Sequence, residues 1–298
     1  MSLLSHKAHL FSVLVGASAL SATTTKQRVA LGAVRPIVAP SVAKANFLAL
    51  GEELEACTAA GCEWLHCSVQ DGVFVPKVSF GHRPVSGSSY SASEQIDPCA
   101  GAPVVAAARK ACPDTVIDVK LGCIDPENRV AEFAAAGADA ISFHPEATKQ
   151  SAAVAQRIRD AGVASGIVLN PGTAVAAVAP LLDMVDLAVV MLVSPGHGGP
   201  KYTEQAVEKV KALRAVRPDL HISVDGGVNA KIAPELLRAG ANVLVAGGAI
   251  FKAADKASVV AELIGNAPHK LKNIKAADLN SGPGGAASPF EDDACPDA

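Results

Sequence analysis

Aromatic residues and long apolar runs are both scarce in this chain of 298 residues, which has one Trp, two Tyr and a net charge of −3. A slightly acidic chain with few aromatic side chains is a poor candidate for nucleic-acid binding. No stretch reaches the roughly 18 uninterrupted apolar residues of a membrane-spanning helix. The hydrophobic content of 50% therefore predicts one large buried core, with neither nucleic acid nor a membrane as partner.

Paired cysteine motifs are also missing. The chain has seven cysteines, an odd number, and no two of them form a Cys-x-x-Cys pair. This pattern disfavours a set of structural disulfides or a zinc site. We expect the cysteines to be mostly reduced and to fill small apolar spaces in the core.

Acidic residues are absent from the first 51 residues, and Glu52 is the first Asp or Glu. Within this segment an apolar run at 10–20 is followed by a Thr-rich stretch with basic residues. That order is typical of a targeting segment, so residues 1–35 are not counted as part of the fold. The same segment predicts import of the protein into a plastid that is surrounded by extra membranes. A secretory signal or a disordered tail is the alternative. Residues 266–298 are rich in Gly, Pro, Asp and Ala and predict a flexible tail.

Residues 36–265 alternate short apolar runs with amphipathic helical patterns. This alternation predicts a single (βα)8 barrel, a TIM barrel in the α/β class, with an open doubly wound sheet as the structural alternative. The first expected strand is not followed by the Gly-x-Gly-x-x-Gly turn of many doubly wound sheets, which favours the barrel. The expected strands are 36–42, 64–69, 116–121, 140–143, 165–169, 187–192, 221–224 and 243–246. Expected helices include 49–60, 127–136, 148–161, 204–216 and 232–239.

Glycine clusters follow the last three expected strands. Because exposed backbone N–H groups after the late strands of a barrel commonly bind phosphate, the clusters predict a phosphorylated small molecule as ligand. Three tight turns without a ligand are the alternative. The residues expected to contact phosphate are Gly196, Gly198, Gly199, Gly226, Gly227, Gly247 and Gly248.

The segment 64–76, WLHCSVQDGVFVP, is expected to be a buried strand that ends in a polar loop. It resembles the ribulose-phosphate 3-epimerase family, whose pattern here is His-x-Asp-x-Met-Asp-Gly-x-Phe-Val-Pro. Further matches lie at 39–41, 143–147, 169–171, 190–199 and 224–229, so the resemblance spans about residues 36–262. Compared with that family, residues 83–102 look like an insertion in the loop after the second strand, either a lid or slack chain.

The resemblance implies proton transfer beside a ketone, through an enediolate held by a divalent metal (zinc, manganese, iron or magnesium) on two His and two Asp. Of these four ligands, His66 and Asp225 are in place, whereas Ser68 replaces the second Asp and Lys120 the second His. An incomplete site beside an ammonium group is a poor cation site, so the chain could also work without a metal.

Two lysines are candidates to supply the charge of the absent metal. Lys44 and Lys120 are both expected near the barrel mouth, where their ammonium groups could stabilise an enediolate. Lys44 could instead extend into solvent along the rim. Asp225 is the matched catalytic carboxylate, with Asp71 as a weaker second. His66 and Met191 are the other expected substrate contacts.

The leading functional hypothesis is a 3-epimerase that interconverts ribulose 5-phosphate and xylulose 5-phosphate. One alternative is a lysine-assisted decarboxylase or other enolate-forming enzyme, because residues 118–120 read Asp-x-Lys. Another is a paralogue that has lost catalysis and only binds a sugar phosphate. The sequence leaves open whether the chain is a monomer or a homo-oligomer.

Overall fold

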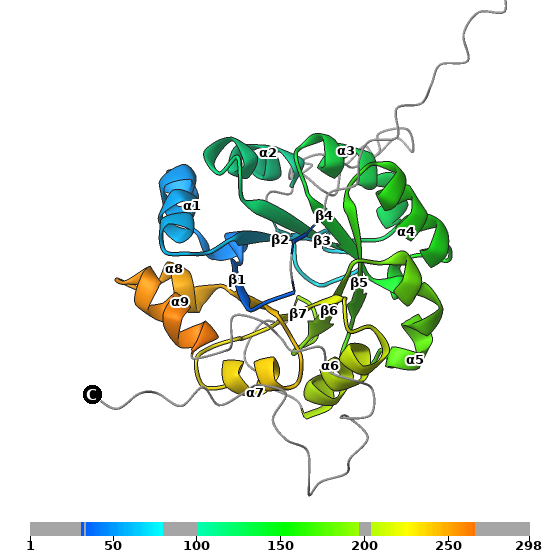
Figure 1. Cartoon of the computed structure of the whole chain (residues 1–298). Coiled ribbons are helices and arrows are strands. Elements are labelled where there is room, and N and C mark those ends of the chain that lie inside the picture. Colours follow the sequence, from blue (N-terminus) through cyan, green and yellow to red (C-terminus); the bar gives the residue numbers. More distant parts are fainter. Residues whose placement is uncertain (1–30, 33, 80–100, 197–203, 266–298) are drawn as a thin grey trace, which may run out of the picture.

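The structure is a computed structural model that describes residues 31–32, 34–79, 101–196 and 204–265. In this part of the chain eight parallel strands form the barrel wall, and helices surround it as an outer ring (Figure 1). The TIM-barrel fold expected from the sequence is therefore confirmed. The expected targeting segment up to residue 30, residues 83–100 of the expected insertion and the tail 266–298 lie outside the described residues.

The strands follow one another around the barrel in the order β1-β8-β7-β6-β5-β4-β3-β2, each parallel to its neighbour. A bridge between Ser41 and His66 brings the β1 side back to β2 and nearly closes the barrel. All eight predicted strands are present, with ends that differ by at most a few residues. Their bounds are β1 Ile37–Pro40, β2 Trp64–Gln70, β3 Val116–Gly122, β4 Ala140–Phe143, β5 Ala164–Leu169, β6 Leu187–Met191, β7 His221–Asp225 and β8 Val243–Ala246.

The five predicted helices are also present, and several elements were not predicted. The predicted helices correspond to α1 Leu50–Ala59, α3 Val130–Ala135, α4 Ser151–Asp160, α6 Glu204–Val216 and α7 Ala233–Arg238. The others are α2 Ala102–Ala111, α5 Val175–Val178, α8 Gly248–Phe251 and α9 Lys256–Ile264. Short 3-10 helices lie at Val42–Lys44, Phe47–Ala49, Pro126–Asn128, Pro145–Ala147 and Ala179–Met184.

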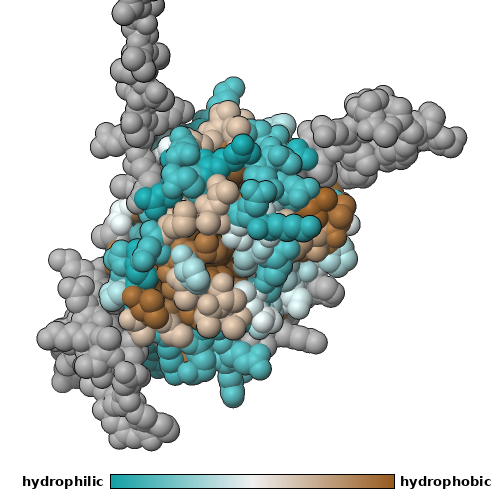
Figure 2. All heavy atoms as spheres, turned by 90° about the vertical axis from the view of Figure 1, so that its right-hand side faces the viewer, coloured by the Kyte–Doolittle hydropathy of each residue, from teal (hydrophilic) through white to brown (hydrophobic). Residues whose placement is uncertain are grey.

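The core has two apolar zones separated by the barrel wall. One zone lies between the strands and the helices and contains Leu54, Phe133 and Ile158. The other lies inside the barrel and includes Trp64 and Val189. The face around α4 and α5 is a mixture of polar residues with smaller apolar areas, as expected where amphipathic helices cover a barrel (Figure 2).

The described cysteines bear out the expectation of buried thiols. Cys57, Cys62, Cys67, Cys112 and Cys123 are all buried and none forms a disulfide. Burial raises the pKa of the Cys57, Cys62 and Cys67 thiols to about 12. These three groups therefore stay protonated and unreactive near neutral pH. No helix in the described part of the chain combines the length and hydropathy needed to cross a membrane.

Candidate active site

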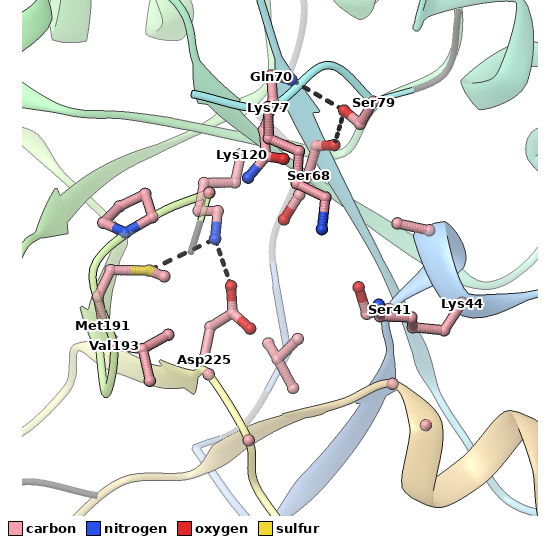
Figure 3. A pocket seen from close by; sticks show the side chains of 18 of the residues that line it. Ser41, Lys44, Ser68, Gln70, Lys77, Ser79, Lys120, Met191, Val193 and Asp225 are labelled. Atoms are coloured by element: carbon pink, nitrogen blue, oxygen red, sulfur yellow. Dashed lines mark hydrogen bonds and ion pairs between the residues drawn. The ribbon is translucent and has the colours of Figure 1, made fainter. Parts of the chain in front are cut away.

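A cavity of about 570 Å³ opens at the carboxyl ends of the strands (Figure 3). This end of a (βα)8 barrel is where active sites are built. Its polar floor and wall include Ser68, Lys120 and Asp225, and its rim includes Lys44 and Lys77. The volume suits a small phosphorylated molecule rather than a polymer.

Strand register determines which polar side chains meet inside the barrel. In the β2–β3 pair, His66 lies beside Asp118 and Ser68 beside Lys120. In the β6–β7 pair, Met191 lies beside Asp225. Because alternate residues of a strand point to the same side, each polar pair on β2 and β3 faces the barrel interior.

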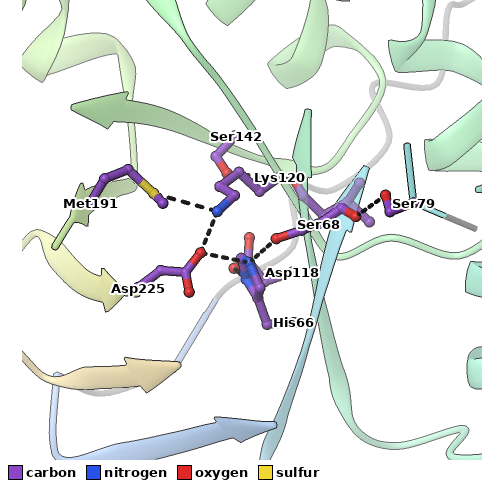
Figure 4. A network of polar contacts seen from close by, with 9 residues as sticks. His66, Ser68, Ser79, Asp118, Lys120, Ser142, Met191 and Asp225 are labelled. Carbon is purple, nitrogen blue, oxygen red and sulfur yellow. Dashed lines mark hydrogen bonds and ion pairs between the residues drawn. The ribbon is translucent and has the colours of Figure 1, made fainter. Parts of the chain in front are cut away.

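Lys120 and Asp225 form an ion pair across the floor of the cavity (Figure 4). The Lys120 side chain is only 3% exposed, and its Nζ also lies 3.4 Å from the Met191 sulfur. Burial alone would raise the pKa of the Asp225 carboxyl, but the charge of Lys120, assisted by His66, outweighs it and lowers the pKa. Asp225 is therefore held as a carboxylate at neutral pH.

His66 is fully buried and connects three of the site's side chains. Its Nδ1 lies 2.7 Å from Asp118 Oδ2, and its Nε2 lies 3.0 Å from Ser68 Oγ. The same Nε2 is 3.7 Å from Asp225 Oδ2. Both ring nitrogens thus have hydrogen-bonding partners, Asp118 on β3 and Ser68 on β2, and Figure 4 shows His66 between Ser68 and Asp225.

The donor set does not fit the divalent metal implied by the family resemblance. Lys120 places an ammonium group against Asp225, where it would repel a cation. No group of three or more His, Cys, Asp or Glu side chains that could hold a metal occurs among the described residues. Two protein ligands, His66 and Asp225, are too few for a stable zinc-type site.

The described glycines that were predicted to bind phosphate lie along one side of the cavity. Gly196, Gly226, Gly227, Gly247 and Gly248 all line it, whereas the expected contacts Gly198 and Gly199 lie outside the described residues. Their shared position leaves backbone N–H groups near the mouth of the cavity, where a phosphate group could reach them.

Lys44 lies on this glycine side, away from the ion pair. It is exposed at the end of a 3-10 helix, apart from Lys120 and Asp225 (Figure 3), and its stem lies against Gly247. A Cβ at position 247 would come within 2.7 Å of Lys44 Cγ, so glycine is needed for this close approach. The sequence had left open whether Lys44 points to the reacting centre or along the rim, and the structure places it on the rim.

Several cavity residues were not among the sequence-based candidates. Lys77, Gln70 and Ser79 line the cavity from β2 and its following loop, and Asp118 contacts His66 beneath it. The period of two along a strand offered a signal, since Asp118 shares a face with Lys120 and Gln70 with Ser68.

The weaker catalytic candidate Asp71 and the buried His144 both have structural surroundings. Asp71 is buried, and its carboxylate accepts hydrogen bonds from the N–H groups of Val73, Phe74 and Ile124. It therefore shapes the loop after β2 and does not line the cavity. His144 is buried against the Phe74 ring, at 4.9 Å between centroids. Its burial and the charge of Lys120 lower the pKa of His144 to about 3.

Two solved structures illustrate the similarity of this fold to known barrels. KGPDC from Streptococcus mutans superposes with a TM-score of 0.54 and 16% identity over 77% of this chain and 95% of that one. A 3-hexulose-6-phosphate synthase superposes with a TM-score of 0.52 and 20% identity over 76% of this chain and 95% of that one. At these identities the likeness shows the fold alone.

Sequence comparison is more specific. The chloroplastic ribulose-5-phosphate-3-epimerase of Arabidopsis thaliana is 39% identical over 230 residues, which is 75% of this chain and 74% of that protein. The ribulose-phosphate 3-epimerase of Bacillus subtilis is 35% identical over 234 residues, or 77% and 98% of the two chains. These relatives do not favour the decarboxylase or the non-catalytic alternative. A sequence model of the ribulose-phosphate 3 epimerase family matches residues 37–97 and 93–251, and the chain belongs to that family.

Proposed function

We propose that this chain is a pentulose-phosphate 3-epimerase that interconverts ribulose 5-phosphate and xylulose 5-phosphate. The observation that carries the proposal is the Asp225 carboxylate, ion-paired to a buried lysine on the floor of a cavity of about 570 Å³. Epimerisation at C3 requires a base that removes a proton beside the ketone and a cation that stabilises the resulting enediolate. Membership of the epimerase family gives the reaction its substrate class.

In this proposal Asp225 and Lys120 divide the chemistry between them. Asp225 is the base, because its lowered pKa keeps it ionised and its carboxylate lines the cavity. Lys120 donates hydrogen bonds to the substrate oxygen on which negative charge develops. A buried ammonium group is effective there, since low-dielectric surroundings strengthen its attraction for an oxyanion.

The other end of the substrate is assigned to the glycine side of the cavity. Backbone N–H groups at Gly226, Gly227, Gly247 and Gly248 would bind the phosphate, and Lys44 would neutralise its charge at the rim. This gives Lys44 a binding role rather than the role in enediolate stabilisation expected from the sequence.

The test is hydrogen–deuterium exchange at C3 of ribulose 5-phosphate, followed by NMR, with protein treated with a chelator. We expect washout of the C3 proton and formation of xylulose 5-phosphate, both unaffected by the chelator because Lys120 stands where a cation would bind. Absence of washout, with or without zinc, manganese, iron or magnesium, would contradict the epimerase assignment and favour a barrel that only binds sugar phosphates.

We also propose that the protein acts in a plastid. The support is the acid-free sequence before Glu52 and the similarity to a chloroplastic epimerase. A fluorescent protein fused behind residues 1–35 should accumulate in the plastids of an alga with extra plastid membranes. Secretion of the fusion would identify the segment as a secretory signal instead.

A further inference from the structure

Epimerisation needs a second proton-transfer group, because the proton leaves one face of C3 and another arrives at the opposite face. Asp225 on β7 serves one face. By the family resemblance, the group for the other face falls on Ser68 of β2. An isolated serine hydroxyl is a poor proton donor or acceptor near neutral pH, so this position requires help from a neighbour.

Ser68 has that help in a chain of three side chains. Its Oγ lies 3.0 Å from His66 Nε2, and His66 Nδ1 lies 2.7 Å from Asp118 Oδ2. His66 and Asp118 are both 0% exposed, whereas Ser68 is partly exposed and lines the cavity. The chain therefore leads from the buried interior to the substrate side, and only its last member can touch the substrate (Figure 4).

Nearby polar groups leave this chain intact. The Ser79 hydroxyl donates to the main-chain carbonyl of Ser68, at 2.6 Å, rather than to its hydroxyl. Lys120 is directed to Asp225. Asp118 holds the imidazole from the side opposite to Ser68, an arrangement that fixes ring orientation and favours proton exchange through Nε2.

We propose that Ser68 is the second catalytic residue of the epimerase, with His66 and Asp118 as the positioning residues that move its proton. This inference rests on the proposed function and names the group that replaces the missing carboxylate. It follows from the geometry of three side chains on two adjacent strands.

The proton balance closes without a further reactant when, in the resting site, Asp225 is ionised and the His66 ring carries a proton on each nitrogen, one donated to Ser68 Oγ and one to Asp118. Asp225 takes the proton from C3, and the electron pair of the C–H bond forms the enediolate. The Ser68 hydroxyl then gives its proton to the opposite face of C3 while the proton on His66 Nε2 moves to the Ser68 oxygen. His66 keeps the proton on Nδ1, held by Asp118.

The site returns to its starting state through a contact already present. After one turnover Asp225 carries a proton and His66 Nε2 lacks one. These two atoms, Asp225 Oδ2 and His66 Nε2, are 3.7 Å apart, close enough for one small adjustment or one water molecule to return the proton. The reverse reaction uses the same groups in the opposite order.

Ser68→Ala separates proton removal from inversion. The variant should still wash out the C3 proton of the epimer whose C–H bond faces Asp225, because Asp225 can remove and return it on one face. Washout from the other epimer, and conversion of either into the other, should fall by about 10²–10⁴-fold, the range typical of general acid–base catalysis. The retained washout shows that the variant is folded. For conversion of the epimers, we expect the substitution to lower kcat far more than it changes KM.

Matched variants distinguish a relay from a packing effect. Ser142→Ala removes a buried hydroxyl whose hydrogen bond runs to the Val119 carbonyl, at 3.5 Å, and should leave conversion unchanged. Asp118→Asn should slow conversion in the wild-type background. In the Ser68→Asp background, a carboxylate can exchange the proton with C3 directly. The slowing of conversion caused by Asp118→Asn should therefore be about tenfold smaller there.

The outcomes are separable from those of the proposed function. If the unaltered protein shows no washout from either epimer, the epimerase assignment fails. If it is active but Ser68→Ala converts the epimers at the normal rate, or loses washout from both epimers equally, the relay is overturned and the epimerase assignment stands.

Discussion

Lys120 and Asp225 form an ion pair in which the buried ammonium group keeps the carboxyl ionised. Lys120→Met keeps the length of the side chain but removes the ammonium group from the cavity floor. We expect C3 proton washout to fall by about 10²–10³-fold, the usual effect of deleting one group that stabilises a developing oxyanion. The NMR exchange assay measures this directly, and near-normal washout would exclude Lys120 from the chemistry.

Lys120→Met should also shift the pH dependence of C3 proton washout in a defined direction. Burial raises the pKa of Asp225, and Lys120 more than offsets this, so the net pKa is lowered. Without Lys120 the pKa should rise, and Asp225 acts as a base only when ionised. The acidic limb of the pH profile for residual washout should therefore move to higher pH in Lys120→Met. In Lys44→Met, which changes an exposed rim residue, that limb should stay in place.

Asp71 shows that a carboxylate near an active site can be structural. It is 4% exposed and accepts three backbone hydrogen bonds, two within its own loop and one from Ile124. Asp71→Ala should lower the free energy of unfolding by about 2–4 kcal/mol, because buried N–H groups lose a charged acceptor. Urea unfolding measures it. The exposed Asp114→Ala should shift stability by less than about 0.5 kcal/mol.

Sequence reasoning indicated which residues would lie near one another but not how they are connected. His66, Lys120 and Asp225 were expected at three of the family's four ligand positions, and the structure brings them together. The Asp118–His66–Ser68 chain was missed, because Asp118 and His66 are 52 positions apart and meet only through the register of β2 and β3. Lys44 was ambiguous, since its direction depends on a short 3-10 helix that apolar patterning does not reveal.

The elements themselves were largely predictable from hydrophobic patterning. Barrel strands are buried on both faces and appear as short apolar runs, which is why all eight were identified. Helix α2 was missed because it follows directly on the Ser-, Gly- and Pro-rich stretch before residue 102, which obscured its beginning. Helices α5 and α8 have four residues each, too few to show a helical period.

Helices α6 and α7 are joined to the barrel base by a buried arginine. Arg214 in α6 donates to the carbonyls of Gly240 and Leu220, and it is 2% exposed. Gly240 has a φ of +108°, and a Cβ there would lie 2.8 Å from Arg214 Cγ. The arginine cannot withdraw without losing several hydrogen bonds, so the turn after α7 requires glycine.

Gly240→Ala should therefore destabilise the protein by about 2–4 kcal/mol, through backbone strain and crowding of Arg214. Gly172→Ala is the matched control, because a Cβ at Gly172 meets nothing within 4 Å. Thermal unfolding of both variants measures the difference. Equal melting temperatures would show that the α7 turn relaxes without cost.

At the scale of the whole molecule, stability and chemistry occupy opposite ends of the barrel. The amino-terminal end of the interior is apolar and contains Trp64, whose ring lies 5.5 Å from that of His221. The carboxyl end contains the buried polar groups His66, Asp118 and Lys120. Burying charge lowers stability unless it is paired, so the polar end depends on the apolar end and the outer helices for its support.

Helix α9 completes that support, and its removal tests how the whole barrel is held together. Its Val260 and Leu263 side chains are 6% and 1% exposed within the outer apolar zone. A chain of residues 31–265 should unfold in one cooperative transition and retain C3 proton washout. A chain ending at residue 255 loses both side chains and should be less stable by about 3–6 kcal/mol. If ending the chain at residue 255 left the urea midpoint unchanged, α9 would be peripheral to the core, and the barrel would be closed by β1 and β8 alone.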